Sequence, residues 1–338
     1  MGQRANLIIG RAGDFELFYS HWHANQLDND LFWGPRHAEK LIRTQRSEEE
    51  GAYWLDEIWA EGGAVLDAHN KRLLWWGGED VLFDIPWRRL FLAVMAEVWR
   101  GWSIEWAYEG VIDLADTLCV PRSRVLNESI TDNHGVSTLD PPGEPDWTDH
   151  VLSIRHSDGT LSFYPGAGKV ERGLADLDEL LRRAQRSPCL EEIDLSQGHW
   201  RSEDFPASGA HLEEANKVIR IWTAHSWPLF TERLESSNPG WTIQWERDRY
   251  ETQLDSTEGR LVFPERSNEE ILGQIREGLL RRERNQTNRV MELASRIAPG
   301  QDVSINPFAL RDDTVTVNRA SKATIFDQAV AAWLSGRN

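Results

Sequence analysis

The chain has 338 residues, of which 40% are hydrophobic and 27% are charged, enough for two or three domains that each bury a core. Its 37 Lys and Arg residues against 55 Asp and Glu residues give a net charge of −18. This acidic excess argues against a nucleic-acid partner, which needs a basic surface. It is compatible with a protein partner, above all a basic one, and also with a charge that only keeps the chain soluble.

Cysteine content and hydropathy predict a cytoplasmic location. Cys119 and Cys189 are the two cysteines, and no Cys-x-x-Cys or Cys/His cluster suggests a zinc site. No run of about 18 apolar residues is present, so we expect no membrane span, and the first residues lack the apolar core of a signal peptide. No motif indicates a cofactor, and the sequence does not indicate the oligomeric state.

The first third of the chain predicts an alternation of strands and helices. Alternating apolar residues indicate strands, and a 3.6-residue apolar period indicates helices. In chain order we expect a strand hairpin at 6–9 and 15–22, a helix that begins at Pro35, strands near 54–59, 64–66 and 72–76, a buried helix at 86–99, and a strand at 102–106.

This unit recurs later in the chain. Gly-Trp-Ser-Ile-Glu-Trp at 101–106 returns as Gly-Trp-Thr-Ile-Gln-Trp at 240–245, and Asn70-Lys71 returns as Asn216-Lys217. Because several matches keep the same order, we expect an α+β protein with two tandem copies of a mixed sheet-plus-helices unit. The expected divisions are a first repeat at 1–126, a Pro-rich linker at 127–149, a second repeat at 150–257 and a partial third strand–helix unit at 258–338.

For residues 258–338 the sequence predicts mainly helices. Gly-Arg-Leu-Val-Phe-Pro at 259–264 resembles the start of the second repeat. Ser267 and Ser321 are expected to cap helices. Between these two helices we expect a helix at 289–297 and strands at 303–305 and 315–317.

The densest group of reactive side chains is His21-Trp22-His23. In an extended segment the two imidazoles would share one face, as in a metal chelate. A metal-assisted hydrolase centred on His21 and His23 is therefore one hypothesis. The alternative is that both histidines cap or line a solvated strand end. The second repeat has Tyr164-Pro165-Gly166 at the corresponding place.

Tryptophan is the second conspicuous feature, with 17 residues. Most of them stand at positions where the helix or strand periodicity predicts an inward-facing side chain. Trp75 and Trp76 are adjacent on an expected strand, so they face opposite ways and one of them leaves its core face. That side chain is either covered by a neighbouring unit or free to contact a carbohydrate or a peptide. Gly77-Gly78-Glu79-Asp80 follows, so Glu79 and Asp80 join the candidate binding residues.

The N-terminal motifs resemble those of a group of bacterial proteins without an established function. These motifs are Gly2-Gln3-Arg4-Ala5-Asn6, Phe18-Tyr19-Ser20-His21-Trp22 and Leu31-Phe32-Trp33-Gly34-Pro35, joined by the Gly-Gly-Glu-Asp step and the Gly-Trp-x-Ile-x-Trp strand. The likeness covers mainly residues 1–120, and a weaker one points to small phage-encoded proteins. The resemblance implies a defence, immunity or regulatory component and supplies no catalytic residues.

These observations favour a non-catalytic protein-interaction factor over an enzyme. The acidic charge, the many tryptophans and the duplicated unit fit an immunity-like or regulatory protein that binds a protein partner. The metal-assisted hydrolase and the carbohydrate- or peptide-binding module remain the alternatives.

Overall fold

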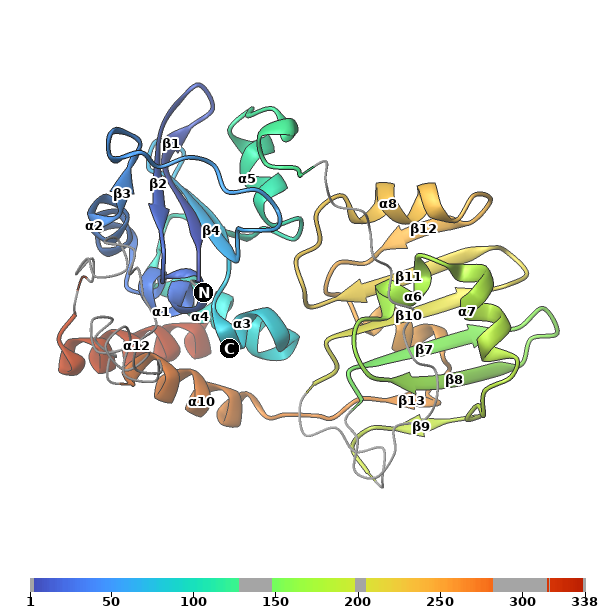
Figure 1. Ribbon diagram of the computed structural model, residues 1–338. Helices are drawn as coiled ribbons and strands as arrows, with labels where there is room; N and C mark the ends of the chain where they lie inside the picture. Colours follow the sequence, from blue (N-terminus) through green and yellow to red (C-terminus); the bar gives the residue numbers. More distant parts are fainter. Residues whose placement is uncertain (1–2, 128–147, 198–204, 282–314, 316, 337–338) are drawn as a thin grey trace, which may run out of the picture. The chain divides into compact units, whose positions relative to one another are not determined.

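The computed structural model describes residues 3–127, 148–197, 205–281, 315 and 317–336 (Figure 1). The chain is an α+β protein and forms two compact units. The first unit comprises residues 1–81, 89–127 and 268–338, and the second comprises residues 82–88 and 128–267. None of the helices in the described ranges is both long and apolar enough to cross a membrane.

The first unit contains a six-stranded mixed sheet in the order β3-β2-β1-β4-β5-β6. Its strands are β1 (Ala5–Arg11), β2 (Asp14–Ser20), β3 (Arg46–Ser47), β4 (Gly62–Asp67), β5 (Arg72–Trp76) and β6 (Ser103–Trp106). The connections carry η1 (Ala24–Gln26), α1 (Leu27–Phe32), α2 (Pro35–Thr44), η2 (Glu48–Glu50), α3 (Glu79–Phe83), α4 (Ile85–Val98), α5 (Val111–Thr117) and η3 (Arg122–Arg124).

The second unit contains a five-stranded sheet in the order β12-β11-β10-β7-β8. Its elements are β7 (His150–Arg155), β8 (Leu161–Gly166), α6 (Val170–Leu174), α7 (Leu177–Ala184), β10 (Ser208–Glu213), β11 (Val218–Thr223), α8 (Phe230–Ser237), β12 (Thr242–Trp245) and α9 (Glu251–Ser256). The short strands β9 (Ile193–Asp194) and β13 (Leu261–Val262) pair separately with each other.

The two sheets confirm the predicted duplication. The order β2-β1-β4-β5-β6 matches β8-β7-β10-β11-β12, and each neighbouring pair has the same direction in both sheets. Lys71 and Lys217 occupy the same turn with left-handed backbones, at φ 51° and 50°. The carbonyls of both lysines accept 2.8 Å hydrogen bonds from the amide of the first residue of the last strand in each sheet, Ser103 of β6 or Thr242 of β12.

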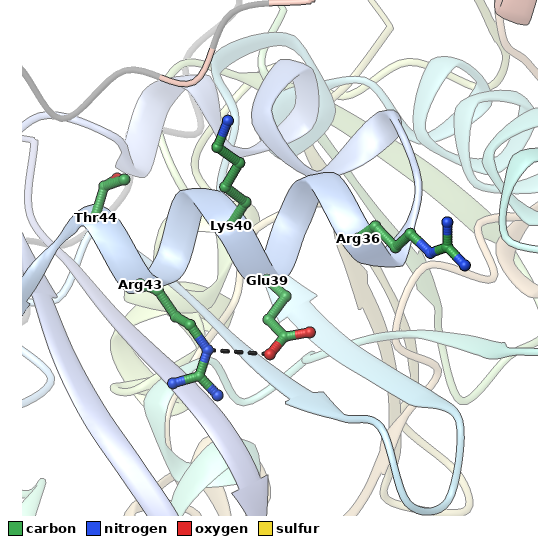
Figure 2. A pocket seen from close by; sticks show the side chains of 5 residues that line it. All are labelled: Arg36, Glu39, Lys40, Arg43 and Thr44. Carbon is green, nitrogen blue, oxygen red and sulfur yellow. Dashed lines mark hydrogen bonds and ion pairs between the residues drawn. The ribbon is translucent and has the colours of Figure 1, made fainter.

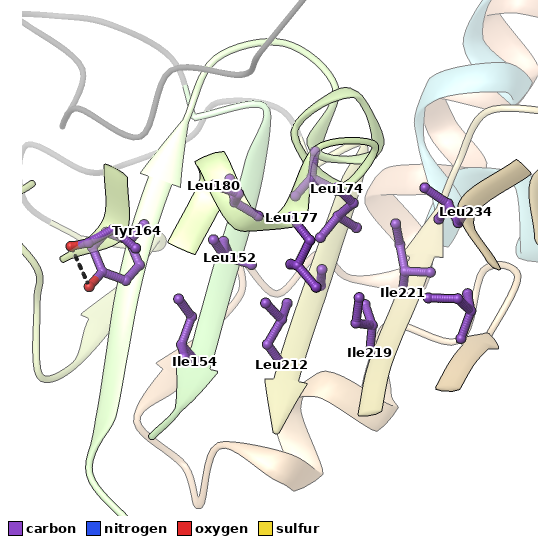
Figure 3. Close-up of a cluster of buried hydrophobic side chains, with 14 of the residues drawn as sticks. Leu152, Ile154, Tyr164, Leu174, Leu177, Leu180, Leu212, Ile219, Ile221 and Leu234 are labelled. Carbon is purple, nitrogen blue, oxygen red and sulfur yellow. Dashed lines mark hydrogen bonds between the residues drawn. The ribbon is translucent and has the colours of Figure 1, made fainter. Parts of the chain in front are cut away.

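Apolar side chains cover both faces of each sheet. In the second unit, Leu152, Leu212 and Ile221 pack against α6, α7 and α8 on one face (Figure 3). On the other face, Val151, Phe163 and Trp222 pack with residues of the β9 and β13 segments. Burying apolar area on both faces supplies most of the favourable free energy of such a layered fold.

Most of the predicted elements lie at or near their expected positions, but residues 54–59 form no strand. The Asn6 side chain takes the place of a strand neighbour there. Its Nδ2 donates to the Leu55 carbonyl and its Oδ1 accepts from the Leu55 amide, both at 3.0 Å. Trp102 also lies outside its strand, since β6 begins at Ser103.

The expected strand–helix segment near the C-terminus is present as β13 and α10 (Asn268–Leu280), and the two belong to different units. The closing helix α12 (Arg319–Ser335) packs in the first unit, where Phe326 contacts Phe32 with ring centroids 6.1 Å apart. Its N-cap is Asn318 instead of Ser321. Val315 and Val317 form no strand, whereas the expected elements at 289–297 and 303–305, and most of the linker at 127–149, lie outside the described residues.

Candidate functional site

One end of the first sheet gathers several of the predicted site residues. Because β1 and β4 are parallel and each pairs with an antiparallel neighbour, the starts of β1 and β4 and the ends of β2 and β5 meet there. Backbone hydrogen bonds connect these segments: Gln3 N donates to His21 O at 2.9 Å, and Gly78 N donates to Ala24 O at 2.7 Å. The segments after β2 and β5, which carry His21–His23 and Glu79–Asp80, are therefore held at the same end.

The two histidines do not share one face of an extended segment, so that expectation is wrong. The strand β2 ends at Ser20, and His23 already has a helical backbone (φ −89°, ψ −9°) ahead of η1. The His21 ring lies 2.6 Å from the Tyr19 hydroxyl and edge-on to Trp22, and His23, only 1% exposed, bonds Asp30 at 2.5 Å. Each imidazole thus has its own partner, and the described residues contain no group of three or more His, Cys, Asp or Glu side chains that could hold a metal ion.

Acidic side chains collect beside this end of the sheet. The pKa of Asp28 is raised to about 7, chiefly by burial and also by the nearby carboxylates of Asp80 and Asp30. Gly78 lies so close that a Cβ atom on it would be 2.9 Å from the Cβ atom of Asp28. Glu79 and Asp80 themselves are exposed in the first turn of α3. The sequence hypothesis missed Asp28 and Asp30, although the Asp-Asn-Asp spacing was visible.

Trp75 and Trp76 do face opposite sides of the sheet, but both are buried, at 0% and 4% exposure. Trp75 packs against Phe91 of α4 on one side. Trp76 lies over Gly63 on the other side, where Leu114 of α5 also packs. Helices of the same chain therefore cover both rings, and neither can serve as a binding platform for a carbohydrate or a peptide.

The large exposed apolar side chains of this region lie instead between β3 and β4. Tyr53, Ile58 and Trp59 are exposed by 64%, 46% and 50%. The loop that carries them is anchored by the Asn6–Leu55 hydrogen bonds and by Asp56, whose Oδ1 accepts from the amides of Ile58 and Trp59 at 3.0 and 3.1 Å. The loop therefore presents these side chains on a fixed backbone. The sequence prediction missed them because it treated residues 54–59 as a strand with inward tryptophans.

The same loop is strongly acidic. No Lys or Arg occurs in residues 47–70, and seven acidic residues do: Glu48, Glu49, Glu50, Asp56, Glu57, Glu61 and Asp67. Arg4 reaches this loop from the start of β1, with its guanidinium 4.3 Å from the centre of the Trp59 ring and its backbone amide 2.8 Å from Glu61 Oε2. The exposed residues Glu48, Glu49, Tyr53, Ile58, Trp59 and Glu61 are called the acidic aromatic surface below.

The second unit contains a buried polar network in place of apolar side chains. Gln253 donates to the Ser153 hydroxyl at 3.0 Å and accepts from Trp222 Nε1 at 2.7 Å, and Ser153 Oγ lies 2.9 Å from His211 Nδ1. Strand register and packing show that the positions of Ser153, His211, Trp222 and Gln253 are occupied in the first unit by Ile8, Val65, Trp76 and Leu114, in that order. Burial lowers the pKa of His211 to about 4. Ser153 is fully buried, so no substrate reaches it as a nucleophile.

An open hollow lies along α2, lined by Arg36, Glu39, Lys40, Arg43 and Thr44 (Figure 2). In Figure 2, Arg43 points toward Glu39, its ion-pair partner at 3.0 Å, whereas Arg36 points away from them. Arg43 also pairs with Glu16. Because all the lining side chains come from one helix and do not converge, the hollow offers no site for a specific ligand.

Comparison with known proteins gave no match to a protein-family model, to a curated protein or to a solved structure. A function must therefore be inferred from the residues of the chain itself.

Proposed function

We propose that the chain is a non-catalytic protein-interaction factor, of the immunity or regulatory kind in bacterial defence, and that it binds its protein partner through the acidic aromatic surface. The observation that carries this proposal is the exposure of Tyr53, Ile58 and Trp59, which are close in sequence and lie on one anchored loop. Clustered apolar side chains on an otherwise charged surface are typical of protein-binding sites.

The energetics favour this surface as a binding site. Burial of exposed apolar area contributes about 25 cal/mol per Å², and tryptophan and tyrosine are common among the residues that dominate binding free energies. Because hydrogen bonds with the Asn6 and Asp56 side chains already hold the loop backbone, binding requires little further ordering. A partner that covers Tyr53, Ile58 and Trp59 would therefore gain most of their burial free energy.

The non-catalytic part of the proposal is supported by the state of the reactive side chains. His21 and His23 are each engaged by a neighbouring side chain, Tyr19 and Asp30. The described part of the second unit has two serine–histidine contacts, Ser153 with His211 and Ser162 with His156, and both serines are buried, at 0% and 8% exposure. None of these arrangements presents an exposed nucleophile with a base beside it.

The test is a capture of partners from the native host with wild-type protein and three variants. Ile58→Ser and Trp59→Ser change the surface, and Leu334→Ser changes a side chain of similar exposure (51%) on α12. Affinities are then measured with the purified partner. We expect Trp59→Ser to weaken binding by at least about 30-fold and Leu334→Ser to leave it unchanged. A partner that binds all variants equally, or the absence of any specific partner, would overturn the proposal.

A further inference from the structure

Resting on the function proposed above, we infer that the partner presents an arginine-rich segment to the acidic aromatic surface. In this arrangement guanidinium groups of the partner pair with Glu48 and Glu49 and stack on the exposed rings of Tyr53 and Trp59. The inference thus names the chemistry of the partner, which the proposed function leaves open.

Charge complementarity is the first argument. The surface draws three carboxylates from a stretch of 24 residues, 47–70, that holds no Lys or Arg. Glu48 and Glu49 are exposed, and neither side chain pairs with a cation among the residues that the structure describes. A basic segment would satisfy both and would be attracted over a distance of about one Debye length, roughly 8–10 Å.

Local structure accounts for only one of the three consecutive glutamates Glu48, Glu49 and Glu50. Ser47 and Glu50 form a capping box, in which the Ser47 amide donates to Glu50 Oε2 at 3.1 Å. This bond explains why a carboxylate stands at position 50. Glu48 and Glu49 take no part in the box, so their charges are available to a partner.

The chain itself stacks arginines on aromatic rings at this surface and beside it. The Arg4 guanidinium covers the Trp59 ring at 4.3 Å, and the Arg46 guanidinium lies 5.9 Å from the centre of the Tyr19 ring. Arg46 Nε also donates to the Glu50 carbonyl at 2.6 Å. Arg4 also hydrogen-bonds an acidic residue, because its backbone amide donates to Glu61. The Arg46 guanidinium thus combines a ring with an oxygen acceptor, and a partner arginine would use the same combination.

Arginine suits this surface better than lysine. Its planar guanidinium stacks on a ring and donates to a carboxylate at the same time, and it loses less hydration than an ammonium group. Tyr53, with 64% of its surface exposed, and Trp59, with 50%, leave ring area for such stacking. We therefore expect an arginine-rich segment to bind more tightly than a lysine-rich segment of the same charge.

The experiment measures binding of short synthetic peptides to the full chain by isothermal titration calorimetry. The peptides are arginine-rich, lysine-rich and glutamate-rich. Glu48→Gln/Glu49→Gln is compared with Glu269→Gln/Glu277→Gln, which removes the same charge from exposed positions of α10. We expect the arginine-rich peptide to bind most tightly, Glu48→Gln/Glu49→Gln to weaken it about 10-fold, and the α10 variant to change it less than about 2-fold.

Three results would overturn the inference. They are equal binding of arginine-rich and glutamate-rich peptides, equal effects of the two double variants, and self-association through Trp59 that excludes the peptide. A failure of this inference can be distinguished from a failure of the proposed function. If a captured partner depends on Trp59 but not on Glu48 and Glu49, the interaction surface stands and the arginine-rich segment is rejected.

Discussion

Trp76 and Gly63 lie directly opposite each other on β5 and β4, and the indole covers the glycine so closely that a Cβ atom on Gly63 would lie 2.5 Å from Cζ3 of the ring. Trp222 and Gly209 repeat this relationship on β11 and β10, where the added Cβ atom would lie 2.6 Å from Nε1. The two copies thus share a tryptophan-on-glycine contact that leaves no room for a methyl group.

This contact predicts that Gly63→Ala and Gly209→Ala each lower the free energy of unfolding by about 1–3 kcal/mol, because the ring must move. Gly273→Ala on α10 is the control, since nothing lies within 4 Å of its added Cβ atom. Alanine in a helix should there raise stability by up to about 1 kcal/mol. Urea unfolding of the three variants provides the measurement, and an unaltered midpoint for Gly63→Ala would contradict the packing.

Asn6 links the fold to the acidic aromatic surface. Asn6→Ala removes both hydrogen bonds to Leu55 and leaves the buried amide and carbonyl of Leu55 without these partners. We therefore expect a loss of about 2–3 kcal/mol in the free energy of unfolding. The released loop should also bind the partner more weakly, because binding would then have to order it. Asn127→Ala, which removes the side-chain hydrogen bond from Asn127 to Asp56, should cost about 1 kcal/mol. Equal stability of wild type and Asn6→Ala would argue against the anchored loop.

Asp28 predicts a pH-dependent gain in stability on substitution. The pKa of Asp28 is about 7 in the folded state and 3.8 in the unfolded state, so between pH 3.8 and pH 7 the carboxyl is protonated in the folded protein and ionised in the unfolded chain. The free energy of unfolding therefore decreases as the pH rises through this range. Asp28→Asn should therefore be more stable than wild type at pH 8, by about 2 kcal/mol after allowance for solvent at the partly exposed carboxyl, and equal to it below pH about 4. Thermal unfolding across this range tests the sign, with Glu79→Gln as an exposed control.

His211 predicts the opposite trend in the second unit. Burial depresses its folded pKa to about 4, while Arg155 and Arg220 lower it and Glu213 raises it by smaller amounts. Its contribution to stability is present above pH 6.5 and lost as pH falls toward 4, by about 3 kcal/mol in total. In His211→Gln, which keeps a polar group that can hydrogen-bond Ser153, the fall in stability between pH 7 and 4 should be smaller. Parallel pH profiles for the two proteins would show that His211 does not titrate as expected.

Much of the fold could be predicted because each copy repeats local signals that agree with its tertiary structure. Asn70-Lys71 and Asn216-Lys217 mark equivalent turns, and both Gly-Trp-x-Ile-x-Trp segments lead into the last strand of a copy. Residues 54–59 were wrongly predicted as a strand, since their apolar content is strand-like but a side chain, Asn6, provides the pairing at Leu55.

The candidate site was less predictable, because it depends on where elements end and what covers them. The period-2 rule put His21 and His23 on one face, but it applies only within a strand, and β2 ends at Ser20. The opposite directions of Trp75 and Trp76 were predicted correctly, but the cover that α5 provides is tertiary information. The exposure of Trp59 likewise follows from the Asp56 turn and not from any apolar period.

Hydrogen exchange of the full chain, with and without the arginine-rich peptide, tests the acidic aromatic surface most directly. In the free protein the amides of Leu55, Glu57 and Trp59 should already be protected, because each donates a hydrogen bond. Peptide addition should slow exchange further in residues 46–61 and leave the second unit unchanged. Rapid exchange of these amides in the free protein, or peptide protection confined to the second unit, would contradict a preformed binding surface at Tyr53, Ile58 and Trp59.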